Sequence, residues 1–139
     1  MVDYHQKYFY INTGNNSLTS STGFKVDNPT FFYKDTMNLN WQINDVTGTG
    51  LNLTGGTFTF VLAGAFNGIP LLTVSDGTFI KTGIATGSIS CVCDMNQGAI
   101  GTFVDLVASK SAYMALWCDL GGITYCLINS QVTINNIIF

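Results

Sequence analysis

Apolar and polar residues alternate along two neighbouring segments of this chain. In residues 35–45 every second position is apolar, at Met37, Leu39, Trp41 and Ile43. After a Gly-rich turn the alternation resumes at Phe58, Phe60 and Leu62. A period of two predicts β-strands that bury one face only. We therefore expect Trp41 and Phe60 to be core residues of a β-sheet.

Short apolar segments separated by turn sequences continue to the C-terminus. The expected strands cover residues 30–33, 71–74, 78–81, 88–93, 113–118, 123–128 and 132–139. The turn sequences are Asn67-Gly68, Ser75-Asp76-Gly77, Thr86-Gly87 and Gly121-Gly122. Short strands with such regular turns are typical of an all-β sandwich and not of βαβ units.

One segment lacks this pattern of short strands and turns. Between residues 94 and 111, apolar side chains recur at intervals of three or four, at Ile100, Phe103, Val104 and Val107. This spacing predicts a short helix, with Asp94 available as its N-cap, that crosses one end of the sandwich.

The N-terminal part of the chain differs in character from the rest. An apolar cluster at residues 8–11, for which a strand and an apolar arm are the two alternatives, precedes a polar segment, 12–23, that has too few large apolar groups to offset its ordering entropy. We expect residues 1–28 to form an extended N-terminal arm or docking strap, and residues 29–139 to form the β-sandwich domain. Deleting residues 1–27 is then expected to leave a folded sandwich that no longer assembles.

The composition supports one all-β domain and disfavours several partners. Of the 139 residues 47% are hydrophobic and only 9% are charged, and the chain contains neither Arg nor Glu. A net charge of −3 without Arg argues against nucleic acid as a partner. No apolar run has the length of a membrane span, and the first residues lack a signal-peptide core. The product is expected to stay in the cytoplasm until it enters a larger assembly.

The chain has four cysteines that could ligate a metal ion: Cys91, Cys93, Cys118 and Cys126. Neither pair has the Cys-x-x-Cys spacing of a zinc knuckle, so free, buried thiols are expected. Cys91 and Cys93 should share one face of a strand, and a cross-strand contact between Cys118 and Cys126 is plausible.

Candidate catalytic groups are few. His5 is the single histidine, and no Gly-x-Ser-x-Gly sequence exists to supply a nucleophile. The aspartates Asp35, Asp45, Asp76 and Asp119 each adjoin a turn, where Asp accepts backbone N–H bonds. Calcium binding at Asn44-Asp45 or at Asp76 lacks the expected twelve-residue loop. We expect a protein without enzymatic activity, bound metal or cofactor.

The order of parts in residues 35–62 resembles a known family. A charged turn, a strand, an Asp-containing turn, Leu53-Thr54-Gly55 and a second strand follow one another. This order resembles the small β-sandwich modules of tailed-phage structural proteins, notably the N-terminal module of baseplate upper proteins and related tail-fibre or head-fibre proteins. The resemblance covers residues 29–139. It implies an immunoglobulin-like antiparallel β-sandwich with one short helical crossover, a virion location, homo-oligomers that are commonly trimers, and other virion proteins as partners.

Both ends of the chain are apolar and lack protecting charges. The expected interface residues are Tyr8, Phe9, Tyr10, Ile137, Ile138 and Phe139. Unprotected apolar strands invite pairing with another chain, so these residues predict an assembly subunit. The two tryptophans, Trp41 and Trp117, are expected in the core. The main alternative is a carbohydrate-binding or adhesin module that uses exposed Tyr and Trp, and a tail-associated glycan hydrolase ranks last.

Overall fold

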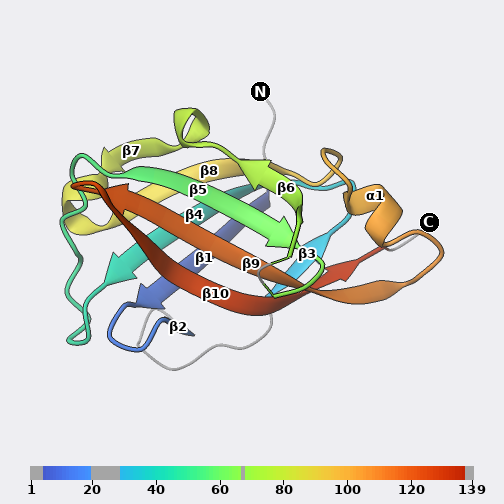
Figure 1. The fold of residues 1–139 in the computed structure, drawn as a ribbon, viewed down its shortest axis with the longest axis horizontal. Coiled ribbons are helices and arrows are strands. Elements are labelled where there is room, and N and C mark those ends of the chain that lie inside the picture. Colours follow the sequence, from blue (N-terminus) through green and yellow to red (C-terminus); the bar gives the residue numbers. More distant parts are fainter. Residues whose placement is uncertain (1–4, 20–28, 67, 137–139) are drawn as a thin grey trace.

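Two five-stranded sheets pack face to face in the computed structural model (Figure 1), which describes residues 5–19, 29–66 and 68–136. Sheet A has the strand order β2 (Ser17–Thr19), β1 (His5–Asn12), β4 (Thr36–Asn44), β8 (Ser88–Asp94) and β7 (Ile80–Gly83). Sheet B has the order β3 (Thr30–Phe32), β10 (Ile123–Asn135), β9 (Ser109–Leu120), β5 (Thr57–Ala63) and β6 (Pro70–Val74). Short 3₁₀ turns, η1 (Asp76–Thr78) and η2 (Ile84–Thr86), flank β7. The expected all-β class is confirmed.

Aromatic side chains from both sheets meet in the core. Trp41 of β4 and Phe60 of β5 are buried, with ring centroids 5.5 Å apart across the two layers. Phe31 of β3 lies 6.3 Å from Phe60 in the same cluster. The expectation that Trp41 and Phe60 are core residues is confirmed, because the apolar face of each alternating strand turns inward.

Residues 5–19 belong to sheet A, which corrects the expected arm. β1 lies between β2 and β4 and pairs with β4 along its whole length. Its alternation buries Phe9 and Ile11 in the core and leaves Tyr8 outside. A domain boundary at Pro29 therefore does not separate this strand from the sheet. The remainder of the expected arm, residues 1–4 and 20–28, lies outside the described residues.

Two strand pairs are parallel, whereas an antiparallel sandwich was expected. β1 runs parallel to β4, and β3 runs parallel to β10. Parallel neighbours need a long connection. β1 and β4 are joined through β2 and β3, and β3 and β10 stand far apart in the sequence, so both pairs meet this requirement.

The strands β9 and β10 form one long hairpin, visible as the orange and red ribbons of sheet B (Figure 1). Gly121 and Gly122 have φ angles of 61° and 80° and make the turn, as the sequence predicts. The two strands expected at 123–128 and 132–139 form a single strand through Asn135, with a register shift between Cys126 and Ile128. A bulge lets the strand bend without ending.

A short helix, α1 (Ile100–Phe103), connects β8 of sheet A to β9 of sheet B, as the spacing predicts. Ile100, its first residue, and Val104, its C-cap residue, are buried in the core. The expected cap is wrong: Ala99 is the N-cap residue, and Asp94 accepts a bond from the backbone N–H of Asn96 at 2.9 Å. Within the described residues, no helix has the length and apolarity to cross a membrane.

Candidate functional site

The outer face of sheet A carries a row of amide side chains. On β4 Asn38, Asn40, Gln42 and Asn44 each follow one of the buried residues Met37, Leu39, Trp41 and Ile43, so the same alternation that fills the core lines the outside with amides. Each amide offers both a hydrogen-bond donor and an acceptor. The polar residues of this alternation are visible in the sequence, but the sequence-based prediction relied only on the apolar ones.

Hydrogen bonds hold these amides in place. Gln6 Oε1 accepts from Asn40 Nδ2 at 2.9 Å and from Asn38 Nδ2 at 3.0 Å. Gln42 Nε2 donates to the Thr86 carbonyl at 2.7 Å, and Gln42 Oε1 accepts from the Ser88 hydroxyl at 2.5 Å. Side chains that hydrogen bonds already hold in one conformation lose little further conformational entropy when a ligand binds.

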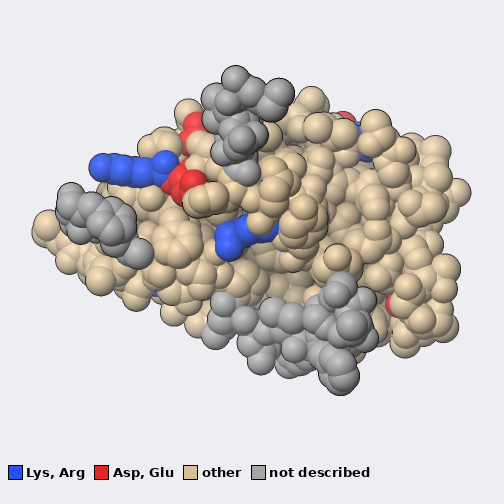
Figure 2. Space-filling model, turned by 180° about the vertical axis from the view of Figure 1, so that it is seen from behind, with Lys and Arg blue, Asp and Glu red and all other residues tan. Residues whose placement is uncertain are grey.

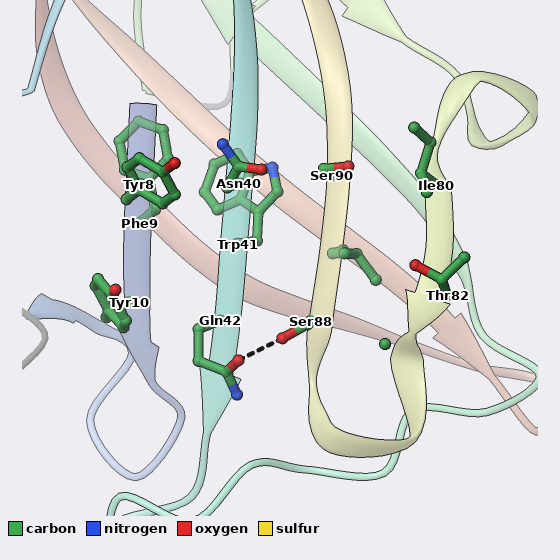
Figure 3. Close-up of a pocket in the computed structure, with 12 residues that line it drawn as sticks. Tyr8, Phe9, Tyr10, Asn40, Trp41, Gln42, Ile80, Thr82, Ser88 and Ser90 are labelled. Carbon is green, nitrogen blue, oxygen red and sulfur yellow. Dashed lines mark hydrogen bonds between the residues drawn. The ribbon is translucent and has the colours of Figure 1, made fainter. Parts of the chain in front are cut away.

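Strand pairing sets these groups into two rows across sheet A (Figure 3). Tyr8, Asn40 and Ser90 lie side by side on β1, β4 and β8, and Ile80 of β7 continues that row. Tyr10, Gln42 and Ser88 make the second row. We call these residues the amide–tyrosine face: Tyr8, Tyr10, Asn40, Gln42, Ser88 and Ser90.

A shallow depression of about 380 Å³ lies over the amide–tyrosine face. None of the residues that line it carries a formal charge. Figure 2 views the molecule from the side of sheet A and shows a surface that is mostly uncharged. Lys7 of β1 lies in the inward phase, with Nζ 5.8 Å from the Phe31 ring centroid, and burial lowers its pKa against the opposing effect of Asp35. The depression therefore suits a neutral ligand.

A second hollow, about 390 Å³, lies on the outer face of sheet B. We call it the sheet B hollow, and its main lining residues are Val61, Ala63, Tyr113, Ala115 and Trp117. Trp117 was expected in the core, and this is wrong. On β9 the buried positions are Met114, Leu116 and Cys118, so Trp117 falls on the outward phase and is half-buried.

Apolar side chains are exposed where the β5–β6 and α1–β9 connections lie. We call this group the apolar end: Phe66, Ile69, Leu106 and Val107. Phe66 meets Tyr113 edge to face, with ring centroids 6.1 Å apart, which joins the apolar end to the sheet B hollow. Ala99 N–H donates to the Leu71 carbonyl at 2.8 Å, so the segment that leads into α1 packs beside β6.

Leu106 is the most unusual residue of the apolar end. Its side chain is 92% exposed, and its φ angle of 62° lies in the left-handed region that leucine rarely adopts. The loop around it is fixed by Asn136, whose N–H donates to the Ala108 carbonyl at 2.8 Å and whose Nδ2 donates to the Val104 carbonyl at 3.0 Å. The sequence shows an apolar loop residue here but does not reveal its backbone conformation.

The residues predicted to form the interface are divided by the structure. Tyr8 is 65% exposed and Tyr10 is half-buried, both on the outer face of sheet A. Phe9 is 6% exposed and stacks on Trp41, so it is a core residue and not a surface anchor. The remaining three, Ile137, Ile138 and Phe139, lie outside the described residues.

The titratable side chains serve mainly in turns. Asp45 accepts from the Thr47 hydroxyl at 2.6 Å and from two backbone N–H groups, and these bonds lower its pKa. Asp76 accepts from the Phe58 N–H and pairs with Lys81 at 2.6 Å. His5 Nδ1 lies 2.6 Å from an Asp35 carboxylate oxygen. Across residues 5–19, 29–66 and 68–136, no three His, Cys, Asp or Glu side chains come together as a metal site.

The cysteines are free thiols on two sheets. Cys91 and Cys93 share the buried face of β8, as predicted, and burial raises the pKa of each to about 12. The expected contact between Cys118 and Cys126 is wrong, because the hairpin register pairs Cys118 with Tyr125 and Cys126 with Trp117. Neighbouring positions along a strand point to opposite faces.

Comparisons with known proteins give a fold relationship. No protein-family model matches the sequence, and no curated protein matches it either. Among solved structures, the N-terminal domain of phage TP901-1 ORF48 is similar with a TM-score of 0.50 and 14% sequence identity. The match covers 96% of this chain and 99% of that chain. The likeness therefore includes the N-terminal strands as well as the part that the sequence predicts to be a sandwich.

Proposed function

We propose that this chain is a structural subunit of a phage virion that acts through protein–protein contacts and not through catalysis. The observation that carries the proposal is the likeness in fold, over 96% of the chain, to the N-terminal domain of a phage protein. The proposed partners are other virion proteins and further copies of this chain, with a trimer favoured. Baseplate, tail fibre and head fibre are the proposed locations, and an immunoglobulin-like arrangement of the strands is part of the same hypothesis.

The apolar end supports a role in assembly. Leu106 and Ile69 are 92% and 88% exposed, and single exposed apolar residues are common, but four in two connections linked by the Ala99–Leu71 hydrogen bond suit a contact surface. A leucine in the left-handed region costs about 1–2 kcal/mol. Strain of this kind is retained where function requires it.

Two contacts extend the apolar end to other parts of the surface. Phe66 and Tyr113 extend it to the sheet B hollow, where Trp117 adds a large aromatic side chain of the type that dominates binding energy at interfaces. Asn136, which fixes the Leu106 loop, directly precedes Ile137 in the sequence. The three C-terminal residues Ile137, Ile138 and Phe139 therefore stay part of the proposed interface.

The mass of the purified full-length chain in solution, measured by light scattering over a range of concentrations, tests self-assembly. We expect an oligomer, with the trimer favoured, that Leu106→Asn weakens. The matched control is Val46→Asn, which replaces another exposed apolar residue in the β4–β5 connection. A monomer at every concentration, or equal loss of mass in both variants, would contradict assembly through the apolar end.

A second candidate function is carbohydrate binding. The observation that favours it is the uncharged amide–tyrosine face on sheet A. This surface is distinct from the apolar end, so both functions can coexist in one subunit.

A further inference from the structure

The amide–tyrosine face has the chemistry of a small-ligand site that assembly through the apolar end does not use. We propose that this face binds a neutral oligosaccharide, which packs a sugar ring against Tyr8 and Tyr10 and hydrogen-bonds to Asn40, Gln42, Ser88 and Ser90. The proposal rests on the second candidate function, for which it names the ligand class and the contacts, and it is independent of the assembly function because the two surfaces share no residue.

Charge identifies the class of ligand. All the residues that line the depression are uncharged, and the chain as a whole carries a net charge of −3. An anionic ligand would meet an unfavourable long-range potential and find no cation in the depression to pair with. A neutral ligand loses no ionic hydration when it binds, so it matches a surface of amides and hydroxyls.

The side chains match a polyhydroxyl ligand in particular. Sugar hydroxyls both donate and accept hydrogen bonds. The amide N–H groups of Asn40 and Gln42 already donate to Gln6, Lys7, Asn44 and Thr86, so a sugar hydroxyl donates to the lone pairs left on the two amide oxygens and on the Ser88 and Ser90 hydroxyls. The networks through Gln6, Thr86 and Ser88 already hold the amides in place. Tyr, Ser and Asn are also the residue types that recognition surfaces favour, because they combine rigid contact area with adaptable hydrogen bonding.

The two tyrosines supply the apolar part of the contact. Tyr8 is 65% exposed and lies directly beside Asn40 in the pairing of β1 with β4. The negative face of an aromatic ring attracts C–H groups of positive character, such as those on one side of a sugar ring. Ile80 bounds the other side of the same row (Figure 3). A depression of about 380 Å³ falls within the range of small-ligand sites.

The position of this face argues against a peptide strand as the occupant. A peptide that adds to a sheet needs an unpaired edge, but β4 is paired with β1 on one side and β8 on the other. The backbone groups of β1, β4 and β8 under the depression are therefore used within the sheet, and a strand added at the β7 edge would lie beside the depression and not over it. Only the side chains that project outward are available to a ligand, and these are uncharged hydrogen-bonding groups.

The test measures binding of soluble oligosaccharides of glucose, of N-acetylglucosamine and of galactose to the full chain. Titration calorimetry gives the affinity, and amide NMR signals of Asn40 and Gln42 report the location. Oligogalacturonate serves as the acidic comparison. We expect at least one neutral probe to bind, to shift the signals of Asn40 and Gln42, and to bind more tightly than the acidic one.

Variants of exposed tyrosines separate the face from the rest of the surface. Tyr8→Ala is expected to weaken binding about tenfold, whereas Tyr8→Phe, which keeps the ring, retains most of it. Tyr125→Ala on sheet B is the matched control, since Tyr125 is also exposed, and it should leave the affinity unchanged.

Several outcomes would overturn the proposal. These are failure of every neutral probe to bind at about 10 mM, equal binding of the acidic probe, or affinity that is unchanged by Tyr8→Ala. A lower oligomeric mass in Tyr8→Ala, without sugar binding by the parent chain, would assign the face to a protein contact instead. A monomeric chain that binds sugar would contradict the assembly proposal alone.

Discussion

Phe9 and Trp41 lie directly opposite each other on the parallel strands β1 and β4, with ring centroids 4.5 Å apart and planes 22° from parallel. Both rings are buried between the sheets. This stacking ties the N-terminal strand to the centre of the core. Removing residues 1–27 would expose Trp41 and leave one side of β4 unpaired, so we expect that truncation to unfold the protein and not merely to prevent assembly.

The contribution of β1 can be measured with a pair of adjacent substitutions. Phe9→Ala is expected to lower the free energy of unfolding by about 3–5 kcal/mol, the usual cost of truncating a buried aromatic residue. Tyr8→Ala, one position away on the outer face, should change it by about 0.5 kcal/mol or less. Urea denaturation of both variants provides the measurement. Similar values for the two would show that β1 is not part of the core.

Phe60 provides the corresponding measurement for sheet B. Phe60→Ala is expected to cost about 3–5 kcal/mol because the ring is buried against Trp41 and Phe31. Thr59→Ala changes the neighbouring position on the opposite face of β5 and serves as the control. A loss below about 1 kcal/mol for Phe60→Ala would mean that the inward phase of this strand is misassigned.

Local alternation explains why much of the fold could be predicted from the sequence. The inward phase of β4 and β5 and the position of α1 follow from residues within one element. The role of β1 did not follow, because its partner β4 begins at Thr36, far along the chain. Segment 8–11 has consecutive aromatic residues, so its alternation shows only once the register with β4 is known. Trp117 was misplaced because residues 112–118 are all apolar, so the sequence does not show which phase of this strand points inward.

The candidate surfaces were harder to predict from the sequence than the fold, because they depend on which strands become neighbours. Tyr8 was identified as a surface residue from its aromatic character, but its row with Asn40 and Ser90 arises from the pairing of three strands. Leu106 stands out only through its backbone angle and exposure. Sequence spacing reports the periodicity of one element and does not report which elements become neighbours.

The thiols of β8 should be unreactive in the folded protein. Burial raises the pKa of Cys91 and of Cys93 from an ordinary 9.0 to about 12, so neither forms the thiolate near pH 8. We expect iodoacetamide to modify both only in denaturant, as mass spectrometry of peptides can show. Because the unfolded state loses these protons first, stability should fall as pH rises from 9 toward 12. Rapid labelling of the folded protein at either position would contradict the buried placement.

Acid should weaken the turn at Asp45. The Thr47 hydroxyl and the backbone N–H groups of the turn lower the pKa of this carboxyl below its ordinary value of 3.8. The unfolded state therefore binds a proton at a higher pH than the folded state, and the stabilisation is present above pH 4 and lost as pH falls through the folded pKa. We expect Asp45→Asn to flatten the acid limb of a stability–pH curve. Thr47→Val should raise the pKa of Asp45 in an NMR titration, and an unchanged pKa would contradict this account.

Leu106 allows stability and assembly to be separated. Its left-handed backbone is easier for Asn, whose short polar side chain tolerates that region, and its side chain makes little contact with the fold at 92% exposure. We therefore expect Leu106→Asn to raise the free energy of unfolding by about 0.5–1 kcal/mol and, at the same time, to weaken self-association. Thermal denaturation at a concentration where the parent chain is monomeric measures the first effect, and light scattering measures the second. Most variants that lose assembly also lose stability, so opposite signs would identify a residue whose strain is maintained for contact with a partner. A variant that is less stable than the parent would show instead that Leu106 serves the fold.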